Sequence, residues 1–212
     1  PLRDLSSKFT VMQSAMAGAE RIFGLLDQPE LDAPSRDAPG AVTPEPGAAA
    51  IEFRDVVFRY KGDRPTLRGV SFRAERGRTV ALVGATGAGK TTVISLLQRL
   101  YEIESGAILV DGVDIRDVAR DALRKRFVVV PQDVVLFPGD VLDNIAVGDG
   151  KPDEAKAARV ADAVGLGALL ARRGEGLRTK VADRGGNFSV GERQLIALAR
   201  ALYRDPEVLI LD

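Results

Sequence analysis

The chain has 212 residues, of which 45% are hydrophobic and 28% are charged, as expected for one large globular domain or for one domain with an appendage. Lys and Arg number 30 in total, and so do Asp and Glu, so no overall basic charge favours nucleic acid as a partner. The absence of cysteine excludes disulfides, thiolate catalysis and zinc–thiolate sites.

Residues 5–27 are expected to form an N-terminal helix. Apolar side chains, among them Phe9, Met12, Met16 and Phe23, recur at steps of three and four residues. So wide an apolar face needs a packing partner, which could be another domain or the helix's own domain. No stretch approaches the roughly 20 apolar residues that span a bilayer.

A proline-rich stretch follows this helix and marks a domain boundary. Between residues 29 and 50, prolines are interspersed with Ala, Asp and Gly, a composition typical of linkers. We therefore divide the chain into segments 1–28, 29–50 and 51–212. Because the sequence starts at Pro1 and stops at Asp212 directly after an apolar stretch, we expect a fragment of a longer protein.

The remaining sequence has both strand and helix patterns, which predicts an α/β fold. Alternating apolar and polar residues, or short apolar runs between turn signals, predict strands at 51–60, 70–74, 79–83, 107–110, 127–130 and 208–211. Helical periodicity predicts helices at 93–97, 141–146, 153–164 and 191–203.

The segment between the strand at 79–83 and the following helix has the pattern of a phosphate-binding loop. Its glycines are predicted to take positive φ and to let backbone N–H groups approach the phosphates. Lys90 is expected to reach the β- and γ-phosphates, and Thr91 to offer its hydroxyl to Mg²⁺. The alternative, a Gly-rich turn that matches by chance, is rare in this strand–helix context. The predicted nucleotide site comprises Gly84, Ala85, Thr86, Gly87, Ala88, Gly89, Lys90, Thr91 and Thr92.

Two further motifs support a nucleotide site, although each alone is common. The strand at 208–211 ends in Asp212, and in a phosphate-loop enzyme such a carboxylate lies close to Mg²⁺, usually through water. Ser189 and Glu192 have the spacing of a capping box, which predicts a helix start. Glycines on both sides of Ser189 leave that helix end open to an anion.

In their order along the chain, residues 84–92, Gln132, 189–194 and 208–212 resemble the motifs of the ATP-binding cassette (ABC) family. The resemblance covers roughly residues 50–212. It implies a P-loop NTPase (RecA-like) core with an antiparallel β-subdomain and a helical subdomain, here preceded by the N-terminal helix.

The signature motif departs from the usual family pattern at three positions. Phe188, Val190 and Glu192 stand where the family usually has Leu, Gly and Gln. Ser189 and Gly191 are kept, and the resemblance implies that these two residues approach the phosphate most closely. Binding is therefore expected to be preserved.

The resemblance also implies roles for single residues. Tyr60 would stack on adenine, and a tyrosine that merely ends a strand is the alternative. Lys90, Gln132 and Asp212 would act in catalysis, and Thr91, Gln132 and Asp212 would hold Mg²⁺. A second ATP, bound by a partner cassette, would be contacted by Ser189, Gly191 and Glu192.

The family mechanism implies a head-to-tail homo- or heterodimer of cassettes that traps two ATP molecules. Hydrolysis then releases the pair of cassettes, which drives the attached membrane domains. The helix at 5–27 resembles the cytoplasmic end of an exporter's last membrane helix. Residues 179–185 resemble a segment found before the signature in exporters, and this resemblance implies that they contact the membrane domain. We therefore expect the ATPase half of an exporter, at the cytoplasmic face of the inner (plasma) membrane, working with its own or a partner's transmembrane domain.

Two other classes are alternatives. A soluble ABC-type ATPase of DNA repair or translation would contain coiled coils or tandem cassettes, for which the sequence shows no pattern. A different phosphate-loop enzyme, such as a nucleotide kinase, would not explain the signature segment. The family places a catalytic Glu directly after Asp212 and a switch histidine beyond it, and neither is among the 212 residues. The chain alone is thus expected to bind MgATP but to hydrolyse it negligibly.

Overall fold

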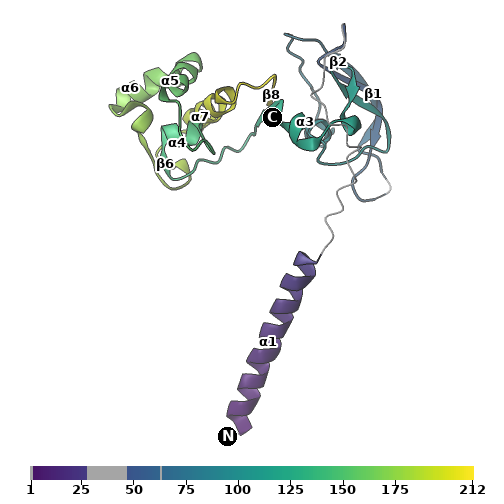
Figure 1. The fold of residues 1–212 in the computed structure, drawn as a ribbon, viewed down its shortest axis with the longest axis vertical. Helices are drawn as coiled ribbons and strands as arrows, with labels where there is room; N and C mark the ends of the chain where they lie inside the picture. The colour runs from purple at the N-terminus through teal and green to yellow at the C-terminus, as the bar shows by residue number, and fades with distance from the viewer. Residues whose placement is uncertain (1, 28–46, 63) are drawn as a thin grey trace. The chain divides into compact units, whose positions relative to one another are not determined.

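The computed structural model describes residues 2–27, 47–62 and 64–212 (Figure 1). The chain forms two compact units, Pro1–Pro34 and Ser35–Asp212. The described strands all belong to the second unit. Residues 29–46 of the predicted linker lie outside the described residues, and residues 47–50 are described.

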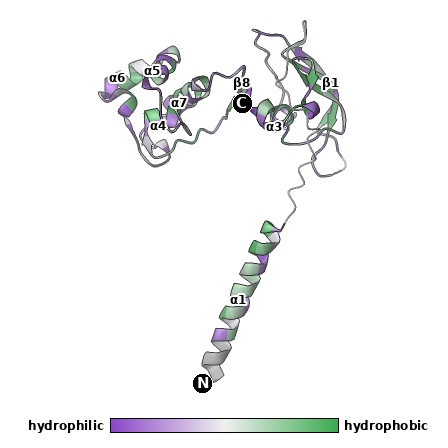
Figure 2. Cartoon of the chain, in the orientation of Figure 1, coloured by the Kyte–Doolittle hydropathy of each residue, from purple (hydrophilic) through white to green (hydrophobic). Residues whose placement is uncertain are grey.

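The predicted N-terminal helix is confirmed as α1 (Leu2–Leu26). Its side chains of Phe9, Met16 and Phe23 are each more than half exposed, at 55%, 63% and 61%. Figure 2 shows hydrophobic residues along much of this helix. Because most helices are stabilised by packing of an apolar face, α1 needs a partner surface. Within the described ranges, no helix combines the length and the apolar character needed to cross a membrane.

The second unit contains a four-stranded antiparallel sheet with the order β2-β1-β3-β4. This sheet confirms the predicted antiparallel elements, with β2 beginning three residues earlier than expected. The strands are β1 (Ile51–Phe58), β2 (Leu67–Ala74), β3 (Ser105–Val110) and β4 (Val113–Asp114).

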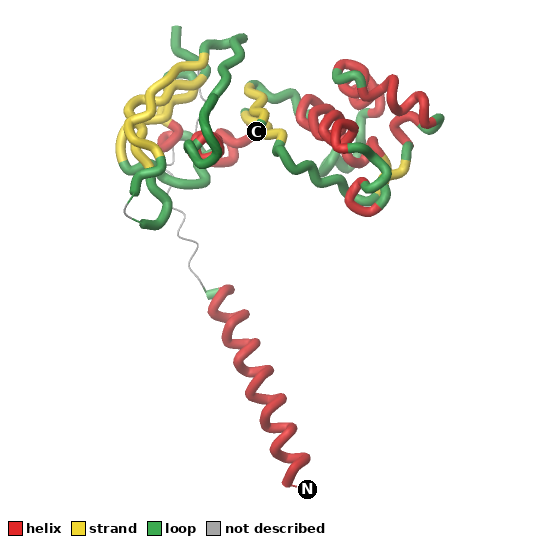
Figure 3. Tube along the Cα trace, turned by 180° about the vertical axis from the view of Figure 1, so that it is seen from behind, coloured by secondary structure: helices red, strands yellow, loops and turns green. Residues whose placement is uncertain are grey.

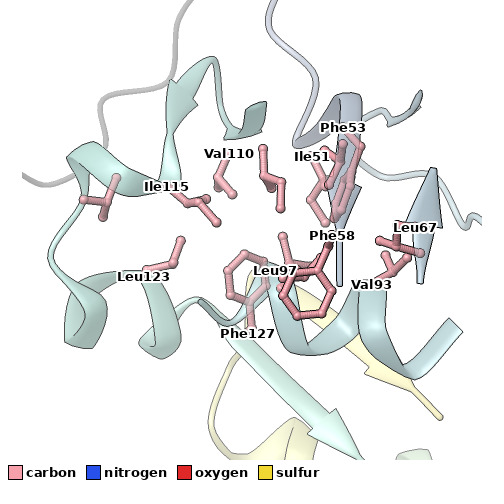
Figure 4. Close-up of a cluster of buried hydrophobic side chains, with 14 residues drawn as sticks. Ile51, Phe53, Phe58, Leu67, Val93, Leu97, Val110, Ile115, Leu123 and Phe127 are labelled. Carbon is pink, nitrogen blue, oxygen red and sulfur yellow. The ribbon is translucent and has the colours of Figure 1, made fainter. Parts of the chain in front are cut away.

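One hydrophobic core lies between this sheet and two helices, α2 (Lys90–Leu97) and α3 (Arg120–Lys125). A 3₁₀ turn, η1 (Ile115–Asp117), leads towards α3. Phe53 of β1 is 1% exposed and stacks on Phe72 of β2 with ring centres 4.6 Å apart. Burial of such a side chain stabilises the fold by about 1.5–3 kcal/mol. Figure 4 shows the side chains that meet there, including Ile51, Phe58, Leu67, Val93, Leu97, Val110, Ile115, Leu123 and Phe127.

Two of the predicted strands form a parallel pair, β5 (Phe127–Val130) with β8 (Val208–Leu211). In this pair Val130 lies opposite Leu211, and the N–H of Asp212 donates to the Val130 carbonyl at 3.1 Å. Because parallel strands end at the same edge of a sheet, the residues that follow β5 and β8 emerge on one side.

The prediction of a strand at 79–83 is wrong for this structure. These residues have no regular secondary structure, and Val83 is 90% exposed. A cavity of about 810 Å³ is lined by residues from Thr79–Leu82 and by β8. An apolar run becomes a strand only when a neighbouring edge takes its backbone hydrogen bonds, and here the segment stays apart from β8.

The helices of the second unit that follow β5 pack around a separate hydrophobic core. In Figure 3 the helices (red) of this group pack on one another. The predicted helices at 141–146, 153–164 and 191–203 are confirmed, whereas α6 and two very short strands were not predicted. The elements are β6 (Gly139–Asp140), α4 (Val141–Ile145), α5 (Glu154–Ala163), α6 (Leu166–Arg173), η2 (Gly176–Arg178), β7 (Lys180–Val181), η3 (Asp183–Gly185) and α7 (Val190–Tyr203).

Candidate nucleotide-binding site

The predicted phosphate loop leads directly into α2, whose first residue is Lys90. Gly87 and Gly89 have φ angles of 82° and 94°, which confirms the left-handed conformation expected at these two positions. Gly84 does not have a positive φ, so that part of the prediction is wrong. A Cβ at Gly84 would lie 3.1 Å from the Ala88 Cβ, so the absence of a side chain at Gly84 lets these two parts of the loop approach closely.

Lys90 folds back over the loop that precedes it. Its Nζ donates to the carbonyl oxygens of Gly84 at 2.9 Å and Ala85 at 3.1 Å. The two carbonyls belong to the exposed part of the loop, residues 84–88. An ammonium group has three donors in a flexible geometry, so it can exchange backbone carbonyls for phosphate oxygens without moving the backbone.

Thr91 and Asp212 meet although they are 121 positions apart in the sequence. The Thr91 hydroxyl donates to Asp212 Oδ1 at 3.5 Å. A hydroxyl and a carboxylate fit Mg²⁺, which prefers oxygen ligands and commonly takes one or two protein groups together with phosphates and water. Among the described residues no group of three or more His, Cys, Asp or Glu side chains could hold a metal ion by itself.

Gln132 is exposed two residues beyond the end of β5. The register of β5 with β8 brings the strand ends together, and Asp212 follows directly after β8. Gln132 and Asp212 therefore emerge at the same sheet edge.

Tyr60 lies beside the residue that ends the predicted loop. Its hydroxyl donates to Thr92 Oγ1 at 3.2 Å, and Thr92 is 5% exposed. The plane of the Tyr60 ring is nearly perpendicular to the rings of Phe58 and Tyr101, at centroid distances of 4.8 Å and 5.0 Å. Tyr60 remains 44% exposed, so a planar group can reach it.

The second predicted group lies at the start of α7, where the capping box is confirmed. The Ser189 N–H donates to Glu192 Oε2 at 2.8 Å, and the Glu192 N–H donates to Ser189 Oγ at 3.3 Å. These bonds, together with the guanidinium of Arg173, lower the pKa of Glu192 to about 2. Gly191 has open space around its Cα, so the helix end is accessible.

The two groups rest on different hydrophobic cores. The loop at 84–92 adjoins the core beneath the antiparallel sheet, which contains Val93 and Leu96. The start of α7 adjoins the helical core, which contains Phe188 and Ile196. The structure thus brings Tyr60, Lys90, Thr91 and Asp212 into one region and holds the capping-box residues on another.

Sequence reasoning missed one contact of the second group, the ion pair between Arg173 and Glu192. Arg173 Nη2 donates to Glu192 Oε1 at 2.9 Å across a separation of 19 residues. Local patterns extend over three or four residues, so no sequence signal linked these two positions.

The model of the ABC transporter family matches residues 67–212. The chain is 43% identical over 216 residues to the fatty acid ABC transporter ATP-binding/permease protein of Mycobacterium tuberculosis, which covers 100% of this chain and 33% of that protein. It is 40% identical over 213 residues to the ATP-dependent lipid A-core flippase of Xanthomonas axonopodis pv. citri, covering 100% of this chain and 35% of that protein. The solved structure of a bacterial Atm1-family ABC exporter with ATP bound matches with a TM-score of 0.79 and 35% identity, over 96% of this chain and 35% of that one.

The fold is that of the ATP-binding cassette ATPases. The chain belongs to the ABC transporter family, and the similar proteins named above are ATP-binding/permease or exporter proteins. It spans about a third of the length of these relatives.

Proposed function

We propose that this chain is the ATP-binding and ATP-hydrolysing part of an ABC exporter, and that ATP-driven dimerisation of two such parts powers the export of a substrate across a membrane. One observation supports this most strongly. The Lys90 ammonium group donates to the carbonyls of Gly84 and Ala85. The hydroxyl of the next residue, Thr91, donates to Asp212 Oδ1 at 3.5 Å. An ammonium group suited to bind phosphate and two oxygen groups suited to bind Mg²⁺ thus belong to adjacent residues and the strand end that they meet, which supports the proposal.

In this proposal each ATP lies between two cassettes arranged head to tail. The residues 84–92 of one chain hold the phosphates, and Tyr60 stacks on the adenine. Ser189, Gly191 and Glu192 of the other chain contact the γ-phosphate. The trapped nucleotide joins the two chains, and hydrolysis releases them.

Thr91 and Asp212 would hold Mg²⁺, with Gln132 as a further ligand when the nucleotide is bound. When present, the ion neutralises charge that develops on the transferred phosphoryl group. Lys90 would add a second positive charge at the phosphates. Hydrolysis by these 212 residues alone is expected to be negligible, and this stays a prediction.

A membrane partner is also part of the proposal. The relatives include proteins described as ATP-binding/permease proteins, and α1 has an exposed apolar face. We infer that segment 1–28 is the cytoplasmic end of a last membrane helix, that 29–50 is a linker and that 51–212 is the cassette. The cassette would act at the cytoplasmic face of the inner (plasma) membrane. A soluble ABC ATPase of DNA repair or translation is not favoured by any of these observations.

The proposal is tested by titration calorimetry of MgATP into the chain and into Lys90→Ala. Removal of the ammonium group that faces the phosphates is expected to abolish most of the affinity, because charge-assisted contacts to phosphate are about twice as strong as neutral ones. The circular dichroism spectrum should stay native. Lys151→Ala, at an exposed lysine outside the loop, is the matched control and should bind as the unmodified chain does. Equal affinities for Lys90→Ala and the control would refute the assignment of this loop.

A further inference from the structure

Arg173, the last residue of α6, packs against the start of α7. Its Nη2 donates to Glu192 Oε1 at 2.9 Å. Its guanidinium carbon also lies 4.5 Å from the centre of the Phe188 ring. The side chains of Arg173 and Glu192 are 32% and 18% exposed, so the pair is partly shielded from water. One guanidinium thus contacts residues on both sides of Ser189.

The charge of Glu192 conflicts with a phosphate-binding role for this helix end. A helix N-terminus has a partial positive charge of roughly half an elementary charge. A carboxylate in the first turn outweighs it and makes the helix end repel an anion. Adding one guanidinium returns the sum to roughly half a positive charge. A helix start that contains Glu192 therefore needs a cation to accept a phosphate.

Neither protonation nor the neighbouring cation Arg193 removes this charge. The pKa of Glu192 is lowered to about 2, mainly by the Ser189 N–H and by Arg173, so the carboxylate stays ionised near neutral pH. Arg193 Nη1 donates to the Phe188 carbonyl at 2.8 Å and is directed at the backbone before Ser189. Arg173 is the cation that contacts the carboxylate.

We propose that Arg173 is a positioning residue of the nucleotide site: it neutralises Glu192 and holds it against the Ser189 N–H, so that the start of α7 accepts the γ-phosphate bound by a second copy of this chain. The inference rests on the proposed function, because it needs the start of α7 to face a partner's nucleotide. It adds a residue from α6, outside the signature segment, to that site.

The test is a double-mutant cycle of Arg173→Ala and Glu192→Gln, read out by sedimentation velocity of the full chain with and without MgATP. Arg173→Ala is expected to weaken the MgATP-dependent dimer by about tenfold or more, because it leaves a like charge beside the phosphate. Calorimetry should show unchanged affinity of the chain's own loop for MgATP. Arg173→Lys should restore most of the dimer, and Arg172→Ala, one position earlier on α6, is the matched control.

The decisive comparison is made in the Glu192→Gln background. Glutamine keeps the hydrogen bonds of the capping box but has no charge, so there Arg173→Ala should change the dimer dissociation constant by less than about twofold. An equal loss in both backgrounds would overturn the inference, since it would mean that Arg173 acts by packing on Phe188. A chain that binds MgATP but never dimerises would instead refute the proposed dimerisation, and the inference with it.

Discussion

At the scale of single residues, Tyr60 shows how neighbouring side chains fix the ring that we propose stacks on adenine. The hydrogen bond from the Tyr60 hydroxyl to Thr92 holds the ring against α2. The rings of Phe58 and Tyr101 pack nearly perpendicular to the Tyr60 ring. The side chain remains 44% exposed, so a planar ligand can still reach the ring. The exposure of Tyr60 therefore supports an adenine-stacking role over that of a tyrosine that merely ends a strand.

Tyr60→Ala should weaken MgATP binding by about 1–3 kcal/mol, the usual value of stacking a base on an aromatic ring. This loss should be far smaller than that of Lys90→Ala. Inorganic triphosphate, which has no base, should bind Tyr60→Ala and the unmodified chain equally well in calorimetry. Tyr60→Phe keeps the ring and is the matched control. If Tyr60→Ala binds ATP unchanged, another residue holds the base.

Local sequence patterns predict contacts between near neighbours, whereas the meeting of Thr91 and Asp212 is implied only by the resemblance to phosphate-loop enzymes. Ser189 and Glu192 are three positions apart, and their reciprocal capping is confirmed. Lys90 follows directly from the loop pattern, and α2 begins there, three residues before the helix predicted at 93–97. The bonds of Tyr60 to Thr92 and of Arg173 to Glu192 span 32 and 19 positions, so they depend on how whole elements pack.

At the scale of elements, Asn144 of α4 holds the segment that follows Gln132. Its side chain is fully buried, accepts from the Phe137 N–H at 2.8 Å and donates to the Phe137 carbonyl at 2.8 Å. Arg200 of α7 adds bonds to the carbonyls of Asn144 at 2.8 Å and Val135 at 3.1 Å. The segment is therefore fixed to α4 and α7.

Asn144→Ala should lower the free energy of unfolding by about 2 kcal/mol, because the buried Asp140 carbonyl and the partly buried backbone groups of Phe137 lose bonds to the amide, and a buried group left unsatisfied costs about 1–3 kcal/mol. Asn187 provides a matched control. It also makes two side-chain bonds, to the Ala182 N–H at 3.0 Å and the Lys180 carbonyl at 2.8 Å, but it is exposed. Asn187→Ala should cost less than about 1 kcal/mol, since water can replace its bonds. Equal losses in urea denaturation would contradict this account of the buried contact.

Most elements were predictable from periodicity, and the exceptions have physical causes. The strand expected at 79–83 satisfied the apolar pattern, but its hydrogen bonds require an adjacent edge that the sequence cannot display. The strands β6 and β7, of two residues each, are too short to show any alternation. Helix α6 has eight residues, and only Leu166 and Leu170 in it are buried. Two buried positions are too few to show a helical period in the sequence.

At the scale of the whole molecule, one chain contains two different halves of the proposed site. The phosphate loop adjoins one hydrophobic core and the start of α7 adjoins the other. A head-to-tail dimer would combine the loop of each chain with the helix start of its partner. The proposal therefore predicts that two defective chains can complement each other.

The measurement that tests this most directly is sedimentation velocity of Lys90→Ala and Ser189→Arg, separately and mixed, scored as the change on adding MgATP. Lys90→Ala lacks a working loop, and Ser189→Arg places a bulky side chain at the helix start. Neither should dimerise alone, but an equimolar mixture should, because the loop of Ser189→Arg and the helix start of Lys90→Ala still form one intact site. If the unmodified chain dimerises with MgATP while the mixture stays monomeric, or if Ser189→Arg alone dimerises as well as the unmodified chain, the shared site is contradicted.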